Sequence, residues 1–481
     1  MKKVKKLLIL AVAIGIVFTM VTGISFVGCK ATRVATTAAE TTAVAETTAV
    51  AETTAAAKGD LVYDPSIAIN DGKPITITLW GDDYFKSFYS KWFTEYSKIH
   101  PNVTIKQEPF VWGNTGEGFL KVADIVKEGV GADLFYSHSQ FFDVCIPNSA
   151  PIPEDVLSAE TIKKYFPQAE NLRWTDGKIH NLPFIVMTYI FYYNKNIWQE
   201  AGLTEKDIPK TWDEFRKVAK KLTKYDDKGS VVQAGFALTQ SAESMHVSLM
   251  YTAGKFLFNE AGTKANFDCP EALVAAQYIH DMYYKDKVDN PDFPYAGDVF
   301  ASGKAAIYGG WTHYLGWLQT TYPDLPFEVG AFKIPSFDGK TPPAYHNNDN
   351  ELSWGVSKYA PKENQAVAWD LLKFIFCTPE AMSDLLLSEG GAPGRVDLYD
   401  YPKILESVAN KVGIEMMDRT IYANMPNIYD VVVRKMINDN IIIIGTSPEE
   451  AIKEGQAIID KELTPFVNKE ALYKYADEMH Y

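Results

Sequence analysis

Residues 75–84, ITITLWGDDY, indicate the fold most directly. Isoleucine and leucine alternate with threonine along the first half, which is the period of two expected for a β-strand. A polar turn then leads into residues 88–99, whose apolar side chains recur on one helical face. Two more strands are predicted at residues 103–105 and 132–136. Strands that alternate with helices predict an α/β fold, in which ligands bind beyond the strand ends.

Further along the chain, the pattern continues. Residues 189–193 form a β-rich run, and residues 211–214, TWDE, have the spacing of a capping box at the start of a helix. Ser447 and Pro448 mark a similar helix start near the carboxyl terminus, with proline at the first helical position. The whole sequence therefore supports one α/β architecture.

Length and composition narrow the possible functions. The chain has 481 residues, and the part after about residue 59 is too long for one small core, which predicts two lobes. A formal net charge of −14 argues against nucleic acid or anionic lipid as a partner. Besides Cys29, only Cys145, Cys269 and Cys377 are present, and their spacing suggests no disulfide framework, although one pair is possible.

The amino terminus predicts export. Four lysines among the first six residues precede an apolar run, so residues 1–28 are expected to be a signal peptide that is removed. Residues 26–29, FVGC, resemble the lipobox of bacterial lipoproteins, in which the cysteine is acylated and becomes the first mature residue. Phe26 stands where that motif usually has leucine. The alternative is a plain signal peptide or a single membrane anchor.

Residues 29–60 have the composition of a tether. The unit TTAVAE occurs intact at residues 41–46 and 47–52, with ragged copies on either side. The segment has no aromatic residue and cannot bury enough surface to offset its ordering entropy. Its alanines could favour a helix, but its paired threonines oppose one. We therefore expect a disordered spacer that holds the folded part away from a membrane.

Several segments together resemble the extracellular solute-binding proteins of ABC importers, specifically the sugar-binding family that includes maltose-binding protein. Residues 300–311, FASGKAAIYGGW, are the most specific of them. The others, in an order and spacing typical of the family, are residues 75–84 with the helix and strand that follow, DGKIHNLPF at 176–184, YYNK at 192–195, TWDEF at 211–215, AWDLLKFI at 368–375 and MPNI at 425–428.

The resemblance implies two α/β lobes joined by strands that cross a hinge, with the ligand in the cleft between them. The first lobe would comprise residues 72–186 and 332–378, and the second residues 187–331 and 379–481. Together with the lipobox, it implies a lipid-anchored monomer on the outer face of the cytoplasmic membrane that hands a carbohydrate, expected to be an oligosaccharide, to a permease. Such a protein uses no cofactor or metal and performs no covalent chemistry.

Carbohydrate recognition needs aromatic faces that stack on sugar rings and polar groups that bond their hydroxyls. Trp311 is the foremost candidate, because the family carries a cleft aromatic residue there, although a core tryptophan is the alternative. Asp82 and Asp83 follow the first strand in a hydroxyl-binding loop of the family, or form a solvated turn. The remaining candidates lie in strand-end, hinge and second-lobe segments: Trp80, Tyr84, Tyr136, His138, Gln140, Thr188, Gln240, Glu243, Arg395 and Tyr429.

Residues 346–355, HNNDNELSWG, are unusually polar. Asp349, Asn350 and Glu351 are chemically suited to calcium, but the segment lacks the spacing of an EF-hand. A hydroxyl-binding loop with Trp354 nearby is favoured over a metal site.

Two other classes of function stay open. A secreted glycosidase would need two carboxylates at a defined separation, but the chain has no HExxH, GxSxG or complete phosphate-loop motif. Related two-lobed proteins bind ferric iron through tyrosine clusters or polyamines through acidic clefts. The pairs Tyr192–Tyr193 and Tyr283–Tyr284 invite the iron interpretation, but neighbouring strand residues face opposite sides.

Overall fold

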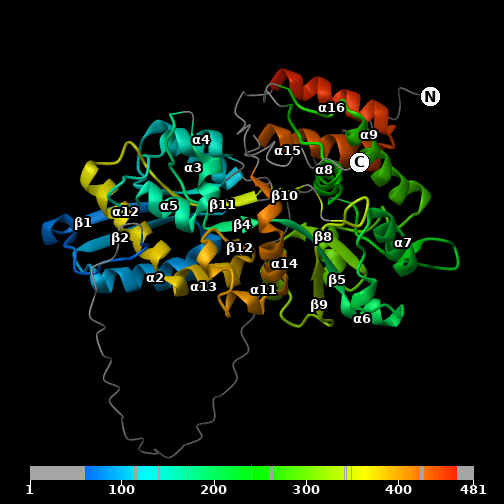
Figure 1. Ribbon diagram of the computed structural model, residues 1–481, viewed down its shortest axis with the longest axis horizontal. Coiled ribbons are helices and arrows are strands. Elements are labelled where there is room, and N and C mark those ends of the chain that lie inside the picture. Colours follow the sequence, from blue (N-terminus) through cyan, green and yellow to red (C-terminus); the bar gives the residue numbers. More distant parts are fainter. Residues whose placement is uncertain are drawn as a thin grey trace, which may run out of the picture. The chain divides into compact units, whose positions relative to one another are not determined.

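The computed structural model describes residues 60–111, 117–138, 141–174, 176–239, 241–259, 264–340, 342, 344–347, 349–422 and 427–462. Across these residues the fold alternates helices and strands, as the sequence predicted (Figure 1). None of the helices described is both long and apolar enough to cross a bilayer.

The largest sheet has six strands, β1 (Ile75–Asp82), β2 (Val103–Phe110), β3 (Leu134–His138), β4 (Ile185–Met187), β11 (Asp349–Val356) and β12 (Ala392–Pro393). Their order is β12-β4-β11-β3-β1-β2. β1 is parallel to β2 and β3, whereas β11 is antiparallel to β3 and β4. The carboxyl ends of β1 to β4 therefore meet the amino end of β11 along one edge, which we call the carboxyl edge.

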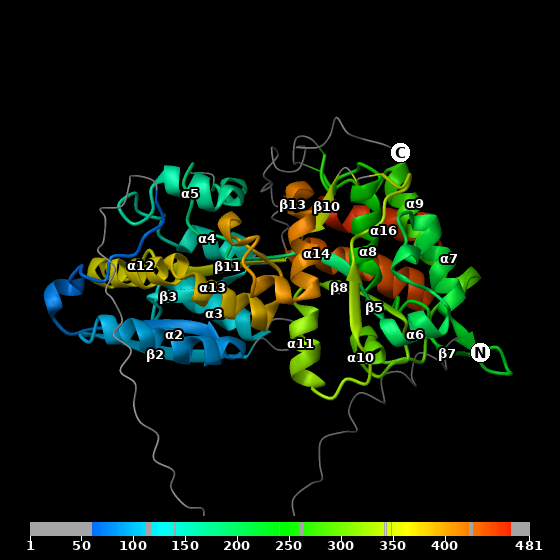
Figure 2. The ribbon, with the colours of Figure 1, turned by 60° about the horizontal axis from the view of Figure 1, so that its bottom comes forward.

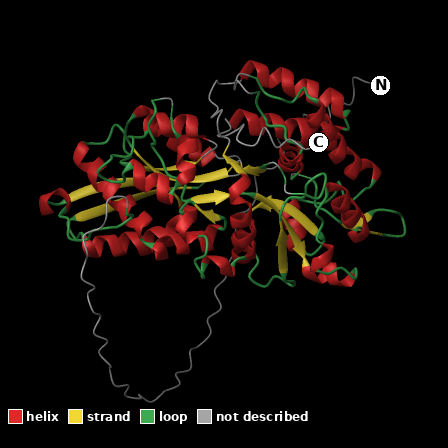
Figure 3. Ribbon diagram, viewed as in Figure 1, coloured by secondary structure: helices red, strands yellow, loops and turns green. Residues whose placement is uncertain are grey.

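Helices flank these strands on both sides (Figure 3). α2, α12 and α13 contact one another, and α3 contacts α4. The helical elements associated with this sheet are η1 (Ile69–Gly72), η2 (Asp83–Phe85), α2 (Lys86–Ile99), α3 (Glu117–Glu128), α4 (Phe142–Asn148), α5 (Ala159–Tyr165), η4 (Pro167–Leu172), α12 (Lys362–Cys377), α13 (Pro379–Glu389), η7 (Val396–Leu398) and η8 (Ile404–Glu406).

Smaller sheets form the second group of strands. β5 (Tyr189–Asn194) lies between β8 (Ile307–Trp311) and β9 (Val329–Phe332) and is antiparallel to both. Two pairs complete the set: β10 (Tyr345–Asn347) with β13 (Thr420–Tyr422), and β6 (Lys224–Tyr225) with β7 (Val231–Gln233). Only Thr188 separates β5 from β4, so this residue connects the two sheets directly.

The helices around the smaller sheets include α7 (Trp212–Leu222), whose predicted capping box is present. Thr211 Oγ1 accepts from the Glu214 backbone N–H, and the Glu214 carboxylate accepts from the Thr211 N–H, each at 3.1 Å. The other helical elements are α6 (Lys195–Glu200), η5 (Glu205–Asp207), α8 (Ala242–Thr252), α9 (Pro270–His280), η6 (Asp281–Lys285), α10 (Ala296–Ala301), α11 (Tyr314–Thr321), α14 (Val408–Met416), η9 (Met417–Arg419), α15 (Asn427–Arg434), η10 (Lys435–Ile444) and α16 (Pro448–Glu462).

Two large hydrophobic cores divide the folded chain. The first core draws on residues 69–187 and 354–404, and the second core on residues 189–345 and 409–459. Three crossings connect them, at Thr188, between residues 345 and 354, and between residues 404 and 409.

The boundaries of the two hydrophobic cores differ from the lobe boundaries that the resemblance implied. The lobe boundaries themselves stay a prediction. Residues 379–404 pack into the first core through side chains of α13, η7 and η8 rather than joining the second. The reason is local: only Thr378 separates α13 from α12, so α13 folds back against α2 and α12. Conversely, residues 332–345 belong to the second core rather than the first.

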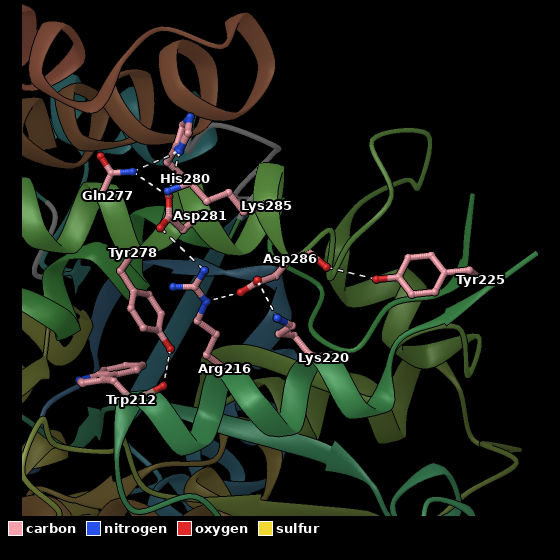
Figure 4. Close-up of polar contacts among 10 residues, drawn as sticks. All are labelled: Trp212, Arg216, Lys220, Tyr225, Gln277, Tyr278, His280, Asp281, Lys285 and Asp286. Atoms are coloured by element: carbon pink, nitrogen blue, oxygen red, sulfur yellow. Dashed lines mark hydrogen bonds and ion pairs between the residues drawn. The ribbon is translucent and has the colours of Figure 1, made fainter. Parts of the chain in front are cut away.

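An ion-pair network fastens α7 to η6 (Figure 4). The Arg216 guanidinium donates to Asp286 and lies 3.7 Å from Asp281, while Lys220 reaches Asp286 at 3.1 Å and Lys285 reaches Asp281 at 2.8 Å. Burial alone would raise the pKa of Asp286, but the hydrogen bonds from Arg216 and Lys220 hold this pKa below its usual value. The network stabilises the outer layer of the second core.

Candidate functional site

The carboxyl edge brings together polar and aromatic residues from four strands. Asp82 ends β1 beside Phe110, which ends β2, and His138 ends β3. Asp82 is 8% exposed and His138 is 6% exposed. The backbone of β11 begins at the same edge, with Glu351 opposite His138 in the register. This is the position at which open α/β sheets bind ligands.

Aromatic rings support this edge from beneath. Tyr136 is buried, and its ring centroid lies 5.4 Å from that of Phe85 and 6.2 Å from those of Phe110 and His138. Because these rings are packed against one another, the edge is held by rigid side chains. A polar group placed on such a support loses little freedom when it bonds a ligand.

Trp311 stands at the end of the smaller sheet, next to the carboxyl edge. It is opposite Tyr189 in the register of β8 and β5, and the two rings meet edge to face at 5.8 Å and 72°. Trp311 is partly buried and packs against both hydrophobic cores. The Thr312 backbone N–H donates to the Thr188 carbonyl at 3.0 Å, which ties this strand end to the crossing. Trp311 therefore lies where the two cores adjoin.

Two histidines from different cores approach each other here. His313, just before α11, places its Nδ1 3.1 Å from the sulfur of Met187 at the end of β4. Burial, and then the neighbouring His313 ring, lowers the pKa of His138 to about 3, and burial lowers the pKa of His313 to about 4. Both rings are therefore neutral at physiological pH, and a neutral imidazole can both donate and accept a hydrogen bond.

The second core contributes a polar pair on the side of Tyr189. Asn438 in η10 donates its amide to the Glu243 carboxylate at 2.5 Å. Glu243 is 8% exposed and Asn438 is 4% exposed, and Asn438 Oδ1 has no hydrogen-bond partner among the described residues. Burial, and then the Glu243 carboxylate, raises the pKa of Tyr189 well above its usual value, so the phenol stays protonated. This pair offers a carboxylate and an amide oxygen as acceptors.

Other candidates from the sequence have structural partners of their own. The Trp354 indole is 2% exposed and lies between Phe88 and Phe184, which cover its two faces at 5.8 and 5.2 Å. It therefore packs in the first core and offers no face to a sugar. The Arg395 guanidinium donates to the Phe376 carbonyl at 2.7 Å and pairs with Asp397 at 2.6 Å.

Two residues near β1 also have local roles. Trp80 donates its indole N–H to the Gly131 carbonyl at 3.2 Å, and Asp83 forms an exposed ion pair with Lys86 at 3.3 Å. Both lie within a few residues of the carboxyl edge, but Trp80 packs against the first core and Asp83 pairs with its neighbour on the surface. Asp82, in contrast, is the last residue of β1 and lies at the carboxyl edge itself.

The remaining candidates are placed only in part. The backbone of Tyr84 lies in η2, that of Tyr429 in α15, and those of Asp349 and Asn350 at the start of β11. Gln140, Gln240 and Cys29 lie outside the described residues, as do the expected signal peptide and the spacer up to residue 59.

Sequence reasoning did not propose Phe110, His313 or Asn438 for the site, whereas it placed Tyr189 with Thr188 at the expected hinge crossing. His313 could have been found as a polar residue two places after Trp311, whereas Phe110 lies beyond the strand predicted at residues 103–105 and ends β2 only in the structure. Asn438, Asp439 and Asn440 separate Met436 and Ile437 from four isoleucines, and a polar residue in such apolar surroundings can mark a buried polar group.

A hollow of about 810 Å³ opens elsewhere, along α12 and residues 150–157. Its lining contains none of the candidate residues named above. Because it lies within the surroundings of the first core alone, it cannot bring the two cores to one ligand.

Comparison with known proteins agrees with this arrangement. The chain is 23% identical over 323 residues to a maltotriose-binding protein of Pyrococcus abyssi, and the match covers 64% of each chain. It is 22% identical over 364 residues to an arabinooligosaccharide-binding protein of Halalkalibacterium halodurans, and this match covers 69% of this chain and 76% of the other. The fold matches maltose-bound MalE3 of T. maritima with a TM-score of 0.65 at 20% identity, covering 81% of this chain and 100% of that one. The family model for bacterial extracellular solute-binding proteins matches residues 81–380, and the chain therefore belongs to that family.

Proposed function

We propose that this protein captures a carbohydrate of oligosaccharide size outside the cytoplasmic membrane and delivers it to the permease of an ABC importer. The observation that carries the proposal is the position of Trp311, a partly buried aromatic residue that packs against both cores beside the carboxyl edge. Lipid attached at Cys29 would keep the protein, as a monomer, close to its permease.

The chemistry of the site suits a sugar. Trp311 supplies an aromatic face for the apolar side of a pyranose ring. Asp82 and Glu243 supply carboxylate acceptors, and the neutral rings of His138 and His313 can donate or accept as the hydroxyl requires. Aromatic support on one side and mixed polar groups on the other are typical of a binding cleft rather than of a catalytic centre.

Delivery would use closure about the crossings between the cores. Asp82 and His138 belong to strands of the first core, whereas Glu243 and Asn438 belong to helices of the second. A ligand that contacts both sets stabilises the conformation in which they approach each other. Thr188 is one of the residues about which this movement would occur, because a single residue there joins β4 to β5.

The cargo is inferred from relatives as well as from the site. Two of them carry maltotriose and arabinooligosaccharide in their names, and a solved structure of the same fold holds maltose. These are saccharides of two or more units, which matches a site that spans two cores. We therefore place neutral oligosaccharides ahead of polyamines, ferric complexes and single sugars.

A thermal-shift screen tests the proposal. Maltose, maltotriose, arabinotriose, mannobiose, glucose, spermidine and ferric citrate would each be added to the purified protein. A ligand at 100 times its Kd adds about 2.7 kcal/mol to the free energy of unfolding, which raises the Tm by several degrees. We expect an oligosaccharide to give the largest rise. A rise with spermidine or ferric citrate alone, or conversion of the sugar to smaller products, would contradict the proposal.

A further inference from the structure

Asp289 is a buried carboxylate that is not among the candidate site residues. It follows Val288 of the second core and is 6% exposed. Its Oδ2 accepts three hydrogen bonds at 2.9 Å each, from the backbone N–H groups of Leu238 and Thr239 and from the Thr239 hydroxyl. Its Oδ1 accepts from the Asn290 N–H at 2.8 Å. All four partners donate, so they fit the ionised carboxylate, which only accepts.

Leu238, Thr239 and Ser241 are the described residues that lead into α8, and we call them the lead segment. They lie at the end of the smaller sheet where Trp311 stands. Just before them, Ala237 pairs with Tyr308 of β8 in a parallel bridge, so the lead segment continues in the direction in which β8 runs to its end. Helix α8 begins directly after the segment, contacts β8 and lies beside it in both views (Figures 1 and 2).

The lead segment is bonded to residues of the candidate site. The Ser241 carbonyl accepts from the Tyr189 hydroxyl at 3.4 Å, and the Tyr189 ring meets that of Trp311 at 5.8 Å. Two residues further on, Glu243 lies in the first turn of α8 and accepts from the Asn438 amide at 2.5 Å. A shift of the lead segment would therefore move the groups that the second core offers to a ligand.

The segment that carries Asp289 is fixed by bonds of its own. The Val288 carbonyl accepts from the Gly235 N–H at 2.9 Å, and the Asn290 amide donates to the Val231 carbonyl at 2.7 Å. Burial raises the pKa of Asp289 even though its four hydrogen bonds act to lower it, so keeping this charge in the core costs stability. Buried charges with a raised pKa are typical of functional sites.

We propose that Asp289 is a positioning residue of the carbohydrate site, which holds the lead segment so that Glu243 and Tyr189 keep the places from which the second core contacts a sugar. This inference rests on the proposed function. Asp289 itself does not touch the ligand. Without its carboxylate, the N–H groups of Leu238 and Thr239 would lose their partner, and the segment would shift to pair them elsewhere. Affinity would fall because the acceptors would no longer be held in place before binding.

Asp289→Asn tests the inference, because an amide keeps the shape of the side chain but turns a donor toward at least one of the four donors. Titration calorimetry would use whichever of maltose, maltotriose, arabinotriose and mannobiose raises the Tm most in the thermal-shift screen. We expect the affinity for that saccharide to fall about tenfold or more and the Tm to fall as well.

Asp133→Asn provides the matched control. Asp133 is 9% exposed and accepts from the Thr78 N–H at 2.7 Å and from the Asn364 amide at 2.9 Å, but it lies at the amino end of β3, opposite the carboxyl edge. This variant should also lower the Tm, because it too weakens a buried carboxylate network, while its affinity should stay within about twofold of wild type. Equal losses of affinity in the two variants would overturn the inference, because they would show a general effect of lost stability.

Two further measurements separate positioning from stability. Thr239→Val removes only the hydroxyl bond and should weaken binding about threefold, so it decides the question if Asp289→Asn does not fold. A double-mutant cycle with Glu243→Gln should show a combined loss at least about threefold smaller than the product of the single losses, because both changes act through Glu243.

Unchanged affinity in a folded Asp289→Asn protein would overturn this inference alone. So would unchanged affinity in Thr239→Val where the first variant does not fold, or a combined loss in the cycle equal to the product. A wild-type protein that binds no carbohydrate would overturn the proposed function and the inference together.

Discussion

Replacing Trp311 by alanine should weaken carbohydrate binding by about tenfold or more. Because the indole is partly buried, an area on the order of 60 Å² stays open to a ligand, and at about 25 cal/mol per Å² this area contributes about 1.5 kcal/mol. At about 1.4 kcal/mol per decade, the expected loss of affinity is about twelvefold. Titration calorimetry with the best oligosaccharide of the screen measures it, and Trp311→Phe should lose less because it keeps an aromatic face.

Trp317→Ala provides the matched control. Trp317 is also partly buried and packs against the second core, but its ring lies on α11, 5.2 Å from that of Tyr314. Both alanine variants should lower the Tm, since each loses packing, while only the Trp311 variant should lower affinity. Equal affinities for Trp311→Ala and wild type would refute the place given to this residue.

Three further predictions concern stability. Gly390→Ala should lower the free energy of unfolding in urea by about 3 kcal/mol, because Gly390 has φ +76° and an added Cβ would lie 2.4 Å from the Thr312 carbonyl oxygen. Gly177 also has φ +76° but has open space around it, so Gly177→Ala should lower this free energy by only about 1 kcal/mol. Similar costs for the two variants would show that the contact with Thr312 is unimportant. Arg216→Met should lower the free energy of unfolding by about 2 kcal/mol at pH 7, because Asp286 loses its guanidinium partner. The difference from wild type should shrink as the pH falls through the lowered pKa of Asp286, because protonation removes the charge that needs the partner. A constant difference down to pH 3 would contradict this account. Burial lowers the pKa of His138 to about 3 and those of His246 and His313 to about 4. Below about pH 6.5 the unfolded chain therefore binds more protons than the folded chain, and the Tm should fall between about pH 6.5 and pH 4. His246→Gln should make that fall less steep, and an unchanged slope would speak against burial of the ring.

The regular elements were predictable because their signals are local. The alternation in residues 75–79, the aromatic face of α2 and the capping box at Thr211 each depend on residues close together in the chain, and all three are present. Trp311, the foremost candidate from the sequence, is the last residue of β8.

Long-range packing was not predictable from these signals. Trp354 follows a polar loop that suggested a ligand contact, but strand β11 carries it inward between Phe88 and Phe184. Arg395 has a short sequence separation from Asp397, yet the second acceptor of its guanidinium is a helix-end carbonyl 19 residues away. Asn438 meets Glu243 across 195 residues of sequence, and no periodic pattern reports such a contact.

A crystal structure of the protein with its best oligosaccharide would test the central claim most directly. We predict a sugar ring stacked on Trp311, with its hydroxyls bonded by Asp82 or His138 of the first core and by Glu243 or Asn438 of the second. A sugar bound in the hollow along α12, or held by residues of one core without Trp311, would contradict the account.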